Sequence, residues 1–285
     1  MNLLKIEDLN VKQVMEIFDK ADDLKNNVKG TELSGKTAVL FFPESSIRTR
    51  ITFEKAVADL GGRSILFQPS TIDKREELKD VIKYIGNWAN FVIIRHSDFS
   101  KVSQLAKYSE IPIINAMTSE NHPCEILSDL YSLSKIRNNY RDLTYTFVGE
   151  KGNISRSWAE IAKVMNLKFN HVCICGNEIK ENDDNYSFHV ELEDILSQSD
   201  IILTDPLSSE LRTKEYIQKY QITLDRMKKT KKNSLLNPCP PFFRSEEVST
   251  DVIESTYFVG YKFKENLLCV QQAIILYCLE HEDDD

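Results

Sequence analysis

The chain has 285 residues, of which 41% are hydrophobic and 28% charged, and its formal net charge is −8. No stretch approaches the roughly 18 apolar residues that a membrane-spanning helix requires, and the opening MNLLKIEDLN has neither the basic segment nor the cleavage site of a secretory signal. The acidic balance argues against a nucleic-acid-binding surface. We therefore expect a cytoplasmic protein with no membrane or nucleic-acid partner, in which any anion site is a local basic cluster.

Short apolar runs rich in β-branched and aromatic residues alternate along the chain with segments of helical periodicity. The runs predict eight strands, at residues 37–42, 64–68, 91–96, 112–116, 144–149, 171–176, 201–205 and 234–239. The periodic segments predict helices at residues 6–24, 48–60, 76–89, 100–109, 123–136, 154–165 and 264–282. Such alternation is typical of an α/β fold, and continuous apolar strands indicate parallel sheets with helices on both faces.

Eight strands fit two doubly wound sheets of about four strands each. The polar stretch 134–144 is the expected boundary between a first domain, residues 1–133, and a second, residues 134–264. Most of the six cysteines lie in apolar runs, where a reduced thiol packs as a small hydrophobic group. Cys173 and Cys175 have no second cysteine pair to complete a zinc site, so we expect no bound metal.

Polar residues follow most of the predicted strands, on the side where open α/β sheets bind their ligands. The stretch ESSIRTRITFE, residues 44–54, lies between the first strand and its helix. Free N–H groups at the helix start, the hydroxyls of Ser46 and Thr49 and the guanidinium of Arg48 would together form a phosphate site. Arg50 should point elsewhere and pair with a carboxylate. The alternative is a capped helix with a solvated basic first turn, but positive side chains have the wrong sign for that end of a helix.

SSIRTRITFE resembles the SxRTR phosphate motif of the aspartate/ornithine carbamoyltransferase family. Four further stretches resemble family elements in the same order: IIRHSD at 93–98, NHPCEILSDLY at 121–131, LNPCPP at 236–241 and FKENLLCVQQAI at 263–274. The resemblance therefore covers essentially the whole chain. It implies a homotrimeric enzyme, without cofactor or metal, that transfers the carbamoyl group of carbamoyl phosphate to an amine. The last segment, residues 265–285, would form a helix that packs back on the carbamoyl-phosphate-binding domain.

The resemblance also assigns the carbamoyl phosphate site. Arg95 and His122 would be the catalytic donors to the carbamoyl oxygen, and the carbamoyl NH2 would meet Glu125 and the backbone carbonyls of Cys239 and Pro240. The phosphate would be held by the motif residues Ser46, Ile47, Arg48 and Thr49, with Ile47 supplying only its backbone. A nucleophilic role for the Cys239 thiol is not expected.

Several positions depart from the family pattern, among them the following three. Glu125 stands where the family has glutamine, Ile47 replaces a threonine, and Asn237 replaces a histidine. A carboxylate beside phosphate raises the energy unless a cation offsets it, so either the donor site is altered or Glu125 is paired, with Arg50 or Arg95 as candidates.

Residues 69–80 resemble the loop that reaches into a neighbouring subunit's site, with Thr71 and Lys74 as the contributing residues. The alternative for residues 74–80 is a solvated, charged helix start.

The second half carries the resemblance to acceptor-binding elements. Asn153 in GEKGNISRSW matches the amino-acid-binding asparagine, and Asp205 and Ser209 in LTDPLSSE match an ornithine-type element. We rank ornithine or a related diamino acid first as acceptor, putrescine-like diamines second and aspartate third. A non-catalytic paralogue that binds carbamoyl phosphate or an amino acid is the remaining alternative.

Overall fold

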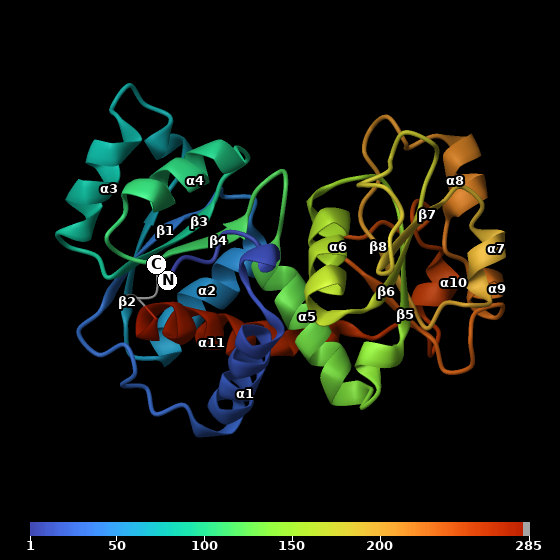
Figure 1. Ribbon diagram of the computed structural model, residues 1–285, viewed down its shortest axis with the longest axis horizontal. Helices are drawn as coiled ribbons and strands as arrows, with labels where there is room; N and C mark the ends of the chain where they lie inside the picture. The colour runs from blue at the N-terminus through green and yellow to red at the C-terminus, as the bar shows by residue number, and fades with distance from the viewer. Residues whose placement is uncertain (282–285) are drawn as a thin grey trace. The chain divides into compact units, whose positions relative to one another are not determined.

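The computed structural model describes residues 1–281, so the last four residues of the predicted C-terminal segment, 282–285, lie outside the described part. The chain forms two compact units (Figure 1). The first unit consists of Met1–Leu133 together with the chain from Lys264 onward, and the second consists of Ser134–Phe263. Within residues 1–281, no helix has the length and apolar character needed to cross a membrane.

The first unit has a four-stranded sheet in which every pairing is parallel. Its strand order is β2-β1-β3-β4. The strands are β1 (Thr37–Phe41), β2 (Arg63–Phe67), β3 (Phe91–Arg95) and β4 (Ile113–Met117). All four lie within one residue of their predicted positions, because each is a short apolar run bounded by turn residues.

Helices cover both faces of this sheet (Figure 1). They are α1 (Val11–Asn27), α2 (Ile47–Asp59), α3 (Leu78–Gly86), α4 (Phe99–Tyr108), α5 (Pro123–Ile136) and α11 (Asn266–Glu280), with the 3-10 turns η1 (Ile6–Asp8), η2 (Pro69–Ile72) and η4 (Tyr261–Glu265). The predicted helix 6–24 is broken at Asn10, whose side chain accepts a hydrogen bond from the N–H of Gln13 and so starts α1.

Alternate residues of the strands build a separate core on each face. Val39, Val92 and Ile94 pack with residues of α3 and α4 in one apolar cluster. On the opposite side of the sheet lie α2 and α11 (Figure 1), and α11 packs along α1 and α2. The predicted return of the C-terminal helix to the first unit is thus confirmed.

The second unit has a five-stranded parallel sheet of order β7-β6-β5-β8-β9. The strands are β5 (Thr144–Val148), β6 (Lys168–Val172), β7 (Tyr186–His189), β8 (Ile201–Thr204) and β9 (Leu235–Pro238). The helices are α6 (Asn153–Met165), α7 (Glu193–Leu196), α8 (Lys214–Tyr220), α9 (Leu224–Met227) and α10 (Thr250–Ile253), with the 3-10 turn η3 (Tyr140–Asp142). The two-unit, parallel α/β fold is the one predicted.

Two details of the second sheet were predicted wrongly. The described residues contain nine strands rather than eight, because the edge strand β7 is short, follows a polar stretch and is only partly buried. The strand expected at 171–176 is β6 at Lys168–Val172, since Lys168 and Asn170 interrupt the apolar pattern at its start. Cys175 is accordingly exposed beyond the strand.

Each sheet has one topological switch point, where successive connections leave in opposite directions from neighbouring strands. In the first unit this point lies between β1 and β3, and in the second between β5 and β8. Loops at the carboxyl ends of such strand pairs diverge and leave room for a ligand. The segments after β1, β3, β5 and β8 are therefore where a binding site is expected.

Candidate active site

The start of α2 forms the centre of the site in the first unit. Ser46 is the N-cap residue, but its hydroxyl makes no capping bond and instead accepts a hydrogen bond of 3.0 Å from Nη1 of Arg95. Ser46 follows β1 and Arg95 ends β3, the two strands that flank the switch point. The pairing of β3 with β4 shifts register between Ile94 and Arg95, and such irregularities re-aim side chains beside functional sites.

The first turn of α2 contains no acidic residue, so its free N–H groups and the helix dipole leave a positive site. Thr49 is buried and Arg48 is exposed. The side chain of Ile47 is 64% exposed. It has no hydrogen-bond donor, so only the backbone N–H of this residue can bind an anion. Arg50 forms an ion pair with Glu54, Nε to Oε1 2.6 Å, as expected from its position on another face of the helix.

His122 stands immediately before α5 and is buried. The turn that leads to it is fixed by the amide of Asn121, whose Oδ1 accepts hydrogen bonds from Asn115 at 2.6 Å and from Thr118 at 2.9 Å. Pro123 is the first residue of α5. Proline fits this position because the backbone nitrogen of the first helical residue makes no hydrogen bond within the helix. Sequence reasoning selected His122 but missed this polar support, because Asn115 reads as part of an apolar strand.

The environment of His122 keeps its imidazole neutral. Burial is the main cause that lowers its pKa to about 4, and Arg95 and Lys264 lower it further while the carboxylate of Glu125 opposes them. A neutral imidazole retains one N–H, which can donate to a substrate oxygen without a prior protonation step. The same charges show that Arg95, Glu125 and Lys264 all act on this histidine.

Glu125 is buried on the first turn of α5 and is paired. Its partner is Lys264, whose Nζ lies 2.6 Å from Oε1 of Glu125 and 2.6 Å from Oδ1 of Asp129. Arg50 and Arg95, the expected candidates, bind Glu54 and Ser46 instead. Burial favours a neutral Glu125, but Lys264, His122 and Arg48 outweigh it and hold the pKa of this carboxyl below its ordinary value.

The second unit places the predicted acceptor residues at its own switch point. Asn153 is the first residue of α6, directly after β5, and Asp205 follows β8 and is half-buried. Ser209 is exposed four residues further on. The two loops are joined by Glu150, whose Oε1 accepts a hydrogen bond of 3.1 Å from the N–H of Ser208.

Gly149 makes the turn out of β5 with a φ of +154°, and an added Cβ would lie 3.1 Å from the ring of Phe147. Its carbonyl accepts a hydrogen bond of 2.9 Å from Nε2 of the buried His171. Because Nε2 must carry the proton, Nδ1 accepts from the hydroxyl of Tyr186 at 3.1 Å. Burial lowers the pKa of His171 to about 4, so this neutral histidine fixes the loop that leads to Asn153.

Cys239 and Pro240 follow β9 in the second unit. The N–H of Cys239 donates to the carbonyl of Thr204 at the end of β8, at 2.9 Å, and the peptide bond between Pro240 and Pro241 is cis. Burial of the Cys239 side chain agrees with a backbone role better than with a nucleophilic thiol. Within residues 1–281, no group of three or more His, Cys, Asp and Glu side chains has an arrangement that could hold a metal ion.

Thr71 and Lys74 lie in the loop that contains η2, in the first unit; Thr71 is half-buried and Lys74 is exposed. Between them, Asp73 accepts a hydrogen bond from Nε2 of His96 at 3.0 Å and pairs with Lys101. These contacts fix the base of the loop to the segment after β3. Within residues 1–281, no contact brings Thr71 or Lys74 to the Ser46–Arg95 pair.

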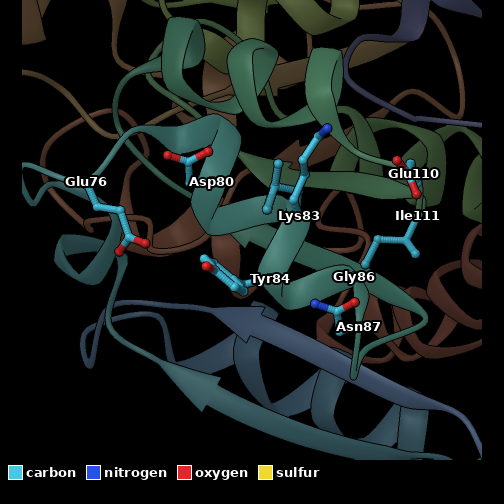
Figure 2. Close-up of a pocket in the computed structure, with 9 residues that line it drawn as sticks. Glu76, Asp80, Lys83, Tyr84, Gly86, Asn87, Glu110 and Ile111 are labelled. Carbon is cyan, nitrogen blue, oxygen red and sulfur yellow. The ribbon is translucent and has the colours of Figure 1, made fainter.

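A separate surface hollow of about 870 Å³ lies along α3 (Figure 2). Its lining includes the charged residues Glu76, Asp80, Lys83 and Glu110, together with Tyr84 of α3. None of the residues named above for the donor or acceptor site lines it. The hollow is therefore distinct from the candidate site.

Residues 1–135 match the family model "Aspartate/ornithine carbamoyltransferase, carbamoyl-P binding domain", and residues 141–278 match "Aspartate/ornithine carbamoyltransferase, Asp/Orn binding domain". The chain belongs to the aspartate/ornithine carbamoyltransferase family. It is thus a carbamoyltransferase, and the resemblance drawn from the five motifs is confirmed.

Individual members of the family match over almost the full chain. The ornithine carbamoyltransferase of Chromobacterium violaceum is 29% identical, covering 99% of this chain and 98% of that protein. That of Methylobacillus flagellatus is 28% identical over 98% of this chain and 97% of that protein. The crystal structure of the Thermus thermophilus ornithine carbamoyltransferase superposes with a TM-score of 0.89 at 25% identity, with 98% of each chain covered.

Proposed function

We propose that this carbamoyltransferase transfers the carbamoyl group of carbamoyl phosphate to the side-chain amine of a diamino acid, with ornithine as the first choice, giving citrulline and phosphate. The observation that carries the proposal is the cluster beside the first switch point, where Arg95 binds Ser46 at the positive start of α2 and also acts on the neutral His122. The relatives in the comparison that are called ornithine carbamoyltransferases support ornithine as the acceptor.

The first unit would bind the donor. The free N–H groups at the start of α2, including that of Ile47, and the hydroxyls of Ser46 and Thr49 would hold the phosphate. Arg48 would neutralise its charge, and a guanidinium matches phosphate oxygens better than an ammonium does. In the second unit, the backbone carbonyls of Cys239 and Pro240 would accept hydrogen bonds from the carbamoyl NH2.

The chemistry requires charge stabilisation at one oxygen. The neutral amine attacks the carbamoyl carbon, a C–N bond forms, and the carbonyl oxygen becomes an oxyanion. Arg95 and His122 would donate hydrogen bonds to it, each typically worth about 3 kcal/mol in the transition state. When the oxyanion collapses, the bond from carbon to the phosphate oxygen breaks. The departing phosphate can accept the proton that the amine loses, so no protein base is required.

The second unit would bind the acceptor. The carboxylate of Asp205 would pair with the α-ammonium group of the amino acid, a charge-assisted contact. Asn153 and Ser209 would supply further polar contacts, and the N-terminus of α6 favours the α-carboxylate because of its positive dipole end. A diamine such as putrescine lacks the α-carboxylate, and aspartate would require additional cations for its second carboxylate.

The decisive experiment is an acceptor panel. The purified protein is incubated with carbamoyl phosphate and, separately, with ornithine, putrescine, diaminopropionate, lysine or aspartate, and both phosphate and ureido product are measured. We expect a ureido product with ornithine and a raised KM for ornithine in Asp205→Asn. If only putrescine or only aspartate gives product, that compound replaces ornithine as the proposed acceptor. If the protein binds the donor but forms no product with any acceptor, it is a non-catalytic paralogue.

We also propose a homotrimer. The edge strand β2 and helix α2 carry four exposed large apolar side chains, Ile47, Ile51, Ile65 and Phe67, which are 64%, 59%, 48% and 41% exposed. Burial of such side chains against another copy of the chain would stabilise an assembly. Thr71 and Lys74 would then serve the site of the neighbouring subunit. A cytoplasmic location stays a prediction, and the six free cysteines agree with a reducing compartment.

A further inference from the structure

Lys264 is the only residue of the donor-site cluster described above that comes from the part of the first unit that follows the second unit in the chain. Its ammonium group bridges Glu125 and Asp129, which are one turn apart on α5 and 5% and 3% exposed, with both Nζ–O distances 2.6 Å. Glu125 and Lys264 are 139 residues apart in sequence. Two buried carboxylates on one helix face repel each other, so a shared cation is needed for both to be ionised.

A contribution to fold stability alone does not account well for the ion triad formed by Glu125, Asp129 and Lys264. Replacing a buried ion pair by apolar residues is often neutral or stabilising, so the pair is weak evidence of a stabilising role. The same junction is already connected by Asn266, whose Nδ2 donates to Oγ of Ser132 at 3.1 Å. The triad also adjoins the donor site, since Lys264 lowers the pKa of His122 and Arg48 lowers the pKa of Glu125.

We propose that Lys264 is a positioning residue of the donor site, which holds Glu125 through Oε1 as a carboxylate so that Oε2 can accept a hydrogen bond from the carbamoyl NH2. The inference rests on the proposed function. A carboxylate accepts this bond as well as a neutral amide does, but its charge lies near the phosphate and must be balanced. Lys264 supplies that balance, and Asp129 fixes the ammonium group in place.

The proposal predicts a specific pH effect. The charged groups that face Glu125 are Lys264 from η4, Asp129 from the same helix and Arg48 from α2. His122 is a titratable neighbour that stays neutral, and Arg95 acts on it. Without the lysine, Glu125 repels the anionic donor at high pH and ceases to do so once it is protonated. Donor binding in Lys264→Met should therefore recover as the pH falls.

The test measures binding by calorimetry, with phosphonoacetamide as a stable analogue of carbamoyl phosphate and inorganic phosphate as a probe without the carbamoyl end. At pH 8 we expect Lys264→Met to bind phosphonoacetamide at least 10-fold more weakly than the wild type does. Each tenfold increase in Kd corresponds to a loss of roughly 1.4 kcal/mol of binding free energy. Lys264→Arg should stay within about threefold of the wild type, because it keeps the charge. Lys262→Met, an exposed lysine two residues earlier, is the matched control and should bind normally.

Rescue separates positioning from folding. In the neutral triad Glu125→Gln/Asp129→Asn/Lys264→Met no charge remains to be balanced, so phosphonoacetamide binding should return to within about threefold of the wild type; this variant also serves if Lys264→Met does not fold. Equal binding by Lys264→Met and Lys262→Met, or a neutral triad as weak as Lys264→Met, would overturn the inference. If the wild type binds neither phosphonoacetamide nor carbamoyl phosphate, the proposed function itself fails.

Discussion

Arg95 donates a hydrogen bond of 3.0 Å to the hydroxyl of Ser46. The two residues are 49 positions apart in sequence, yet Ser46 follows β1 and Arg95 ends β3, which are neighbouring strands of one parallel sheet. The contact draws the guanidinium toward the start of α2, so that a group suited to a carbonyl oxygen lies beside a group suited to phosphate. A small molecule that carries both chemical groups, as carbamoyl phosphate does, fits this arrangement.

The phosphate role of Arg48 can be tested against a neighbour on the same helix. Arg48→Ala should weaken carbamoyl phosphate binding by roughly 10- to 100-fold, because a hydrogen bond to a charged group contributes about 1.5–3 kcal/mol. Arg50→Ala is the control: Arg50 pairs with Glu54 at the surface, and such pairs contribute little. Calorimetric titration of both variants with carbamoyl phosphate measures the two losses of affinity. Equal losses in Arg48→Ala and Arg50→Ala would contradict the assignment of Arg48 to the phosphate.

His122 should act on the chemical step without a protonation requirement. We expect His122→Ala to lower kcat roughly 10²- to 10³-fold with a smaller change in the donor KM, because the interaction strengthens in the transition state. With its pKa near 4, His122 stays neutral above about pH 5, so kcat of the wild type should show no inflection from this group between pH 5.5 and 8. An inflection that disappears in His122→Asn would contradict the neutral-donor role.

The second unit should lose stability in acid because of His171. Its pKa is about 4 when folded and near 6.5 when unfolded, so only the unfolded chain takes up the proton between these values. The stabilisation is complete above pH 6.5, falls as the pH drops to 4, and amounts to about 3 kcal/mol at most. Because Glu247 contributes an opposite slope over much of this range, the effect is read as the difference between the wild type and His171→Gln. Urea titrations followed by the fluorescence of Trp158, buried against Tyr145, should show that His171→Gln removes the uptake of about one proton on unfolding.

Glu247 should produce the opposite pH dependence in the same unit. Burial raises its pKa to about 7, although its Oε1 accepts a hydrogen bond of 2.5 Å from the N–H of Phe243. The folded state holds the proton between pH 4.5 and 7, so stability is lost as the pH rises through this range. Glu247→Gln keeps an acceptor without the charge, and it should raise the free energy of unfolding at pH 8 by about 2 kcal/mol. No gain at pH 8 would show that the carboxylate is accommodated as an anion.

The assembly proposal predicts that charge introduced on α2 and on the edge strand β2 prevents association. Ile51→Glu combined with Phe67→Glu should convert the trimer to a monomer in analytical ultracentrifugation, because each introduces a charge into an apolar contact. Ile174→Glu, which changes an exposed apolar residue of the second unit, should leave the mass unchanged. A wild-type monomer at micromolar concentration would reject the proposal outright.

The sequence by itself determined the fold class and the start of the site. Apolar runs mark strands and three-and-four periodicity marks helices because each pattern follows from local backbone geometry. The cluster of Ser46, Arg48 and Thr49 was visible for the same reason: a helix N-terminus and the residues around it form one contiguous stretch. His122 was found because a motif places it directly before a helix.

Tertiary structure alone decided which distant side chains meet. Nothing near Lys264 in sequence indicates that its ammonium lies between Glu125 and Asp129, since that contact requires the C-terminal segment to return to α5. The edge strand β7 and the polar support of His122 were missed because each depends on neighbours from other parts of the chain. Local patterns define elements, whereas contacts between buried charges are set by packing over long sequence separations, which periodicity does not encode.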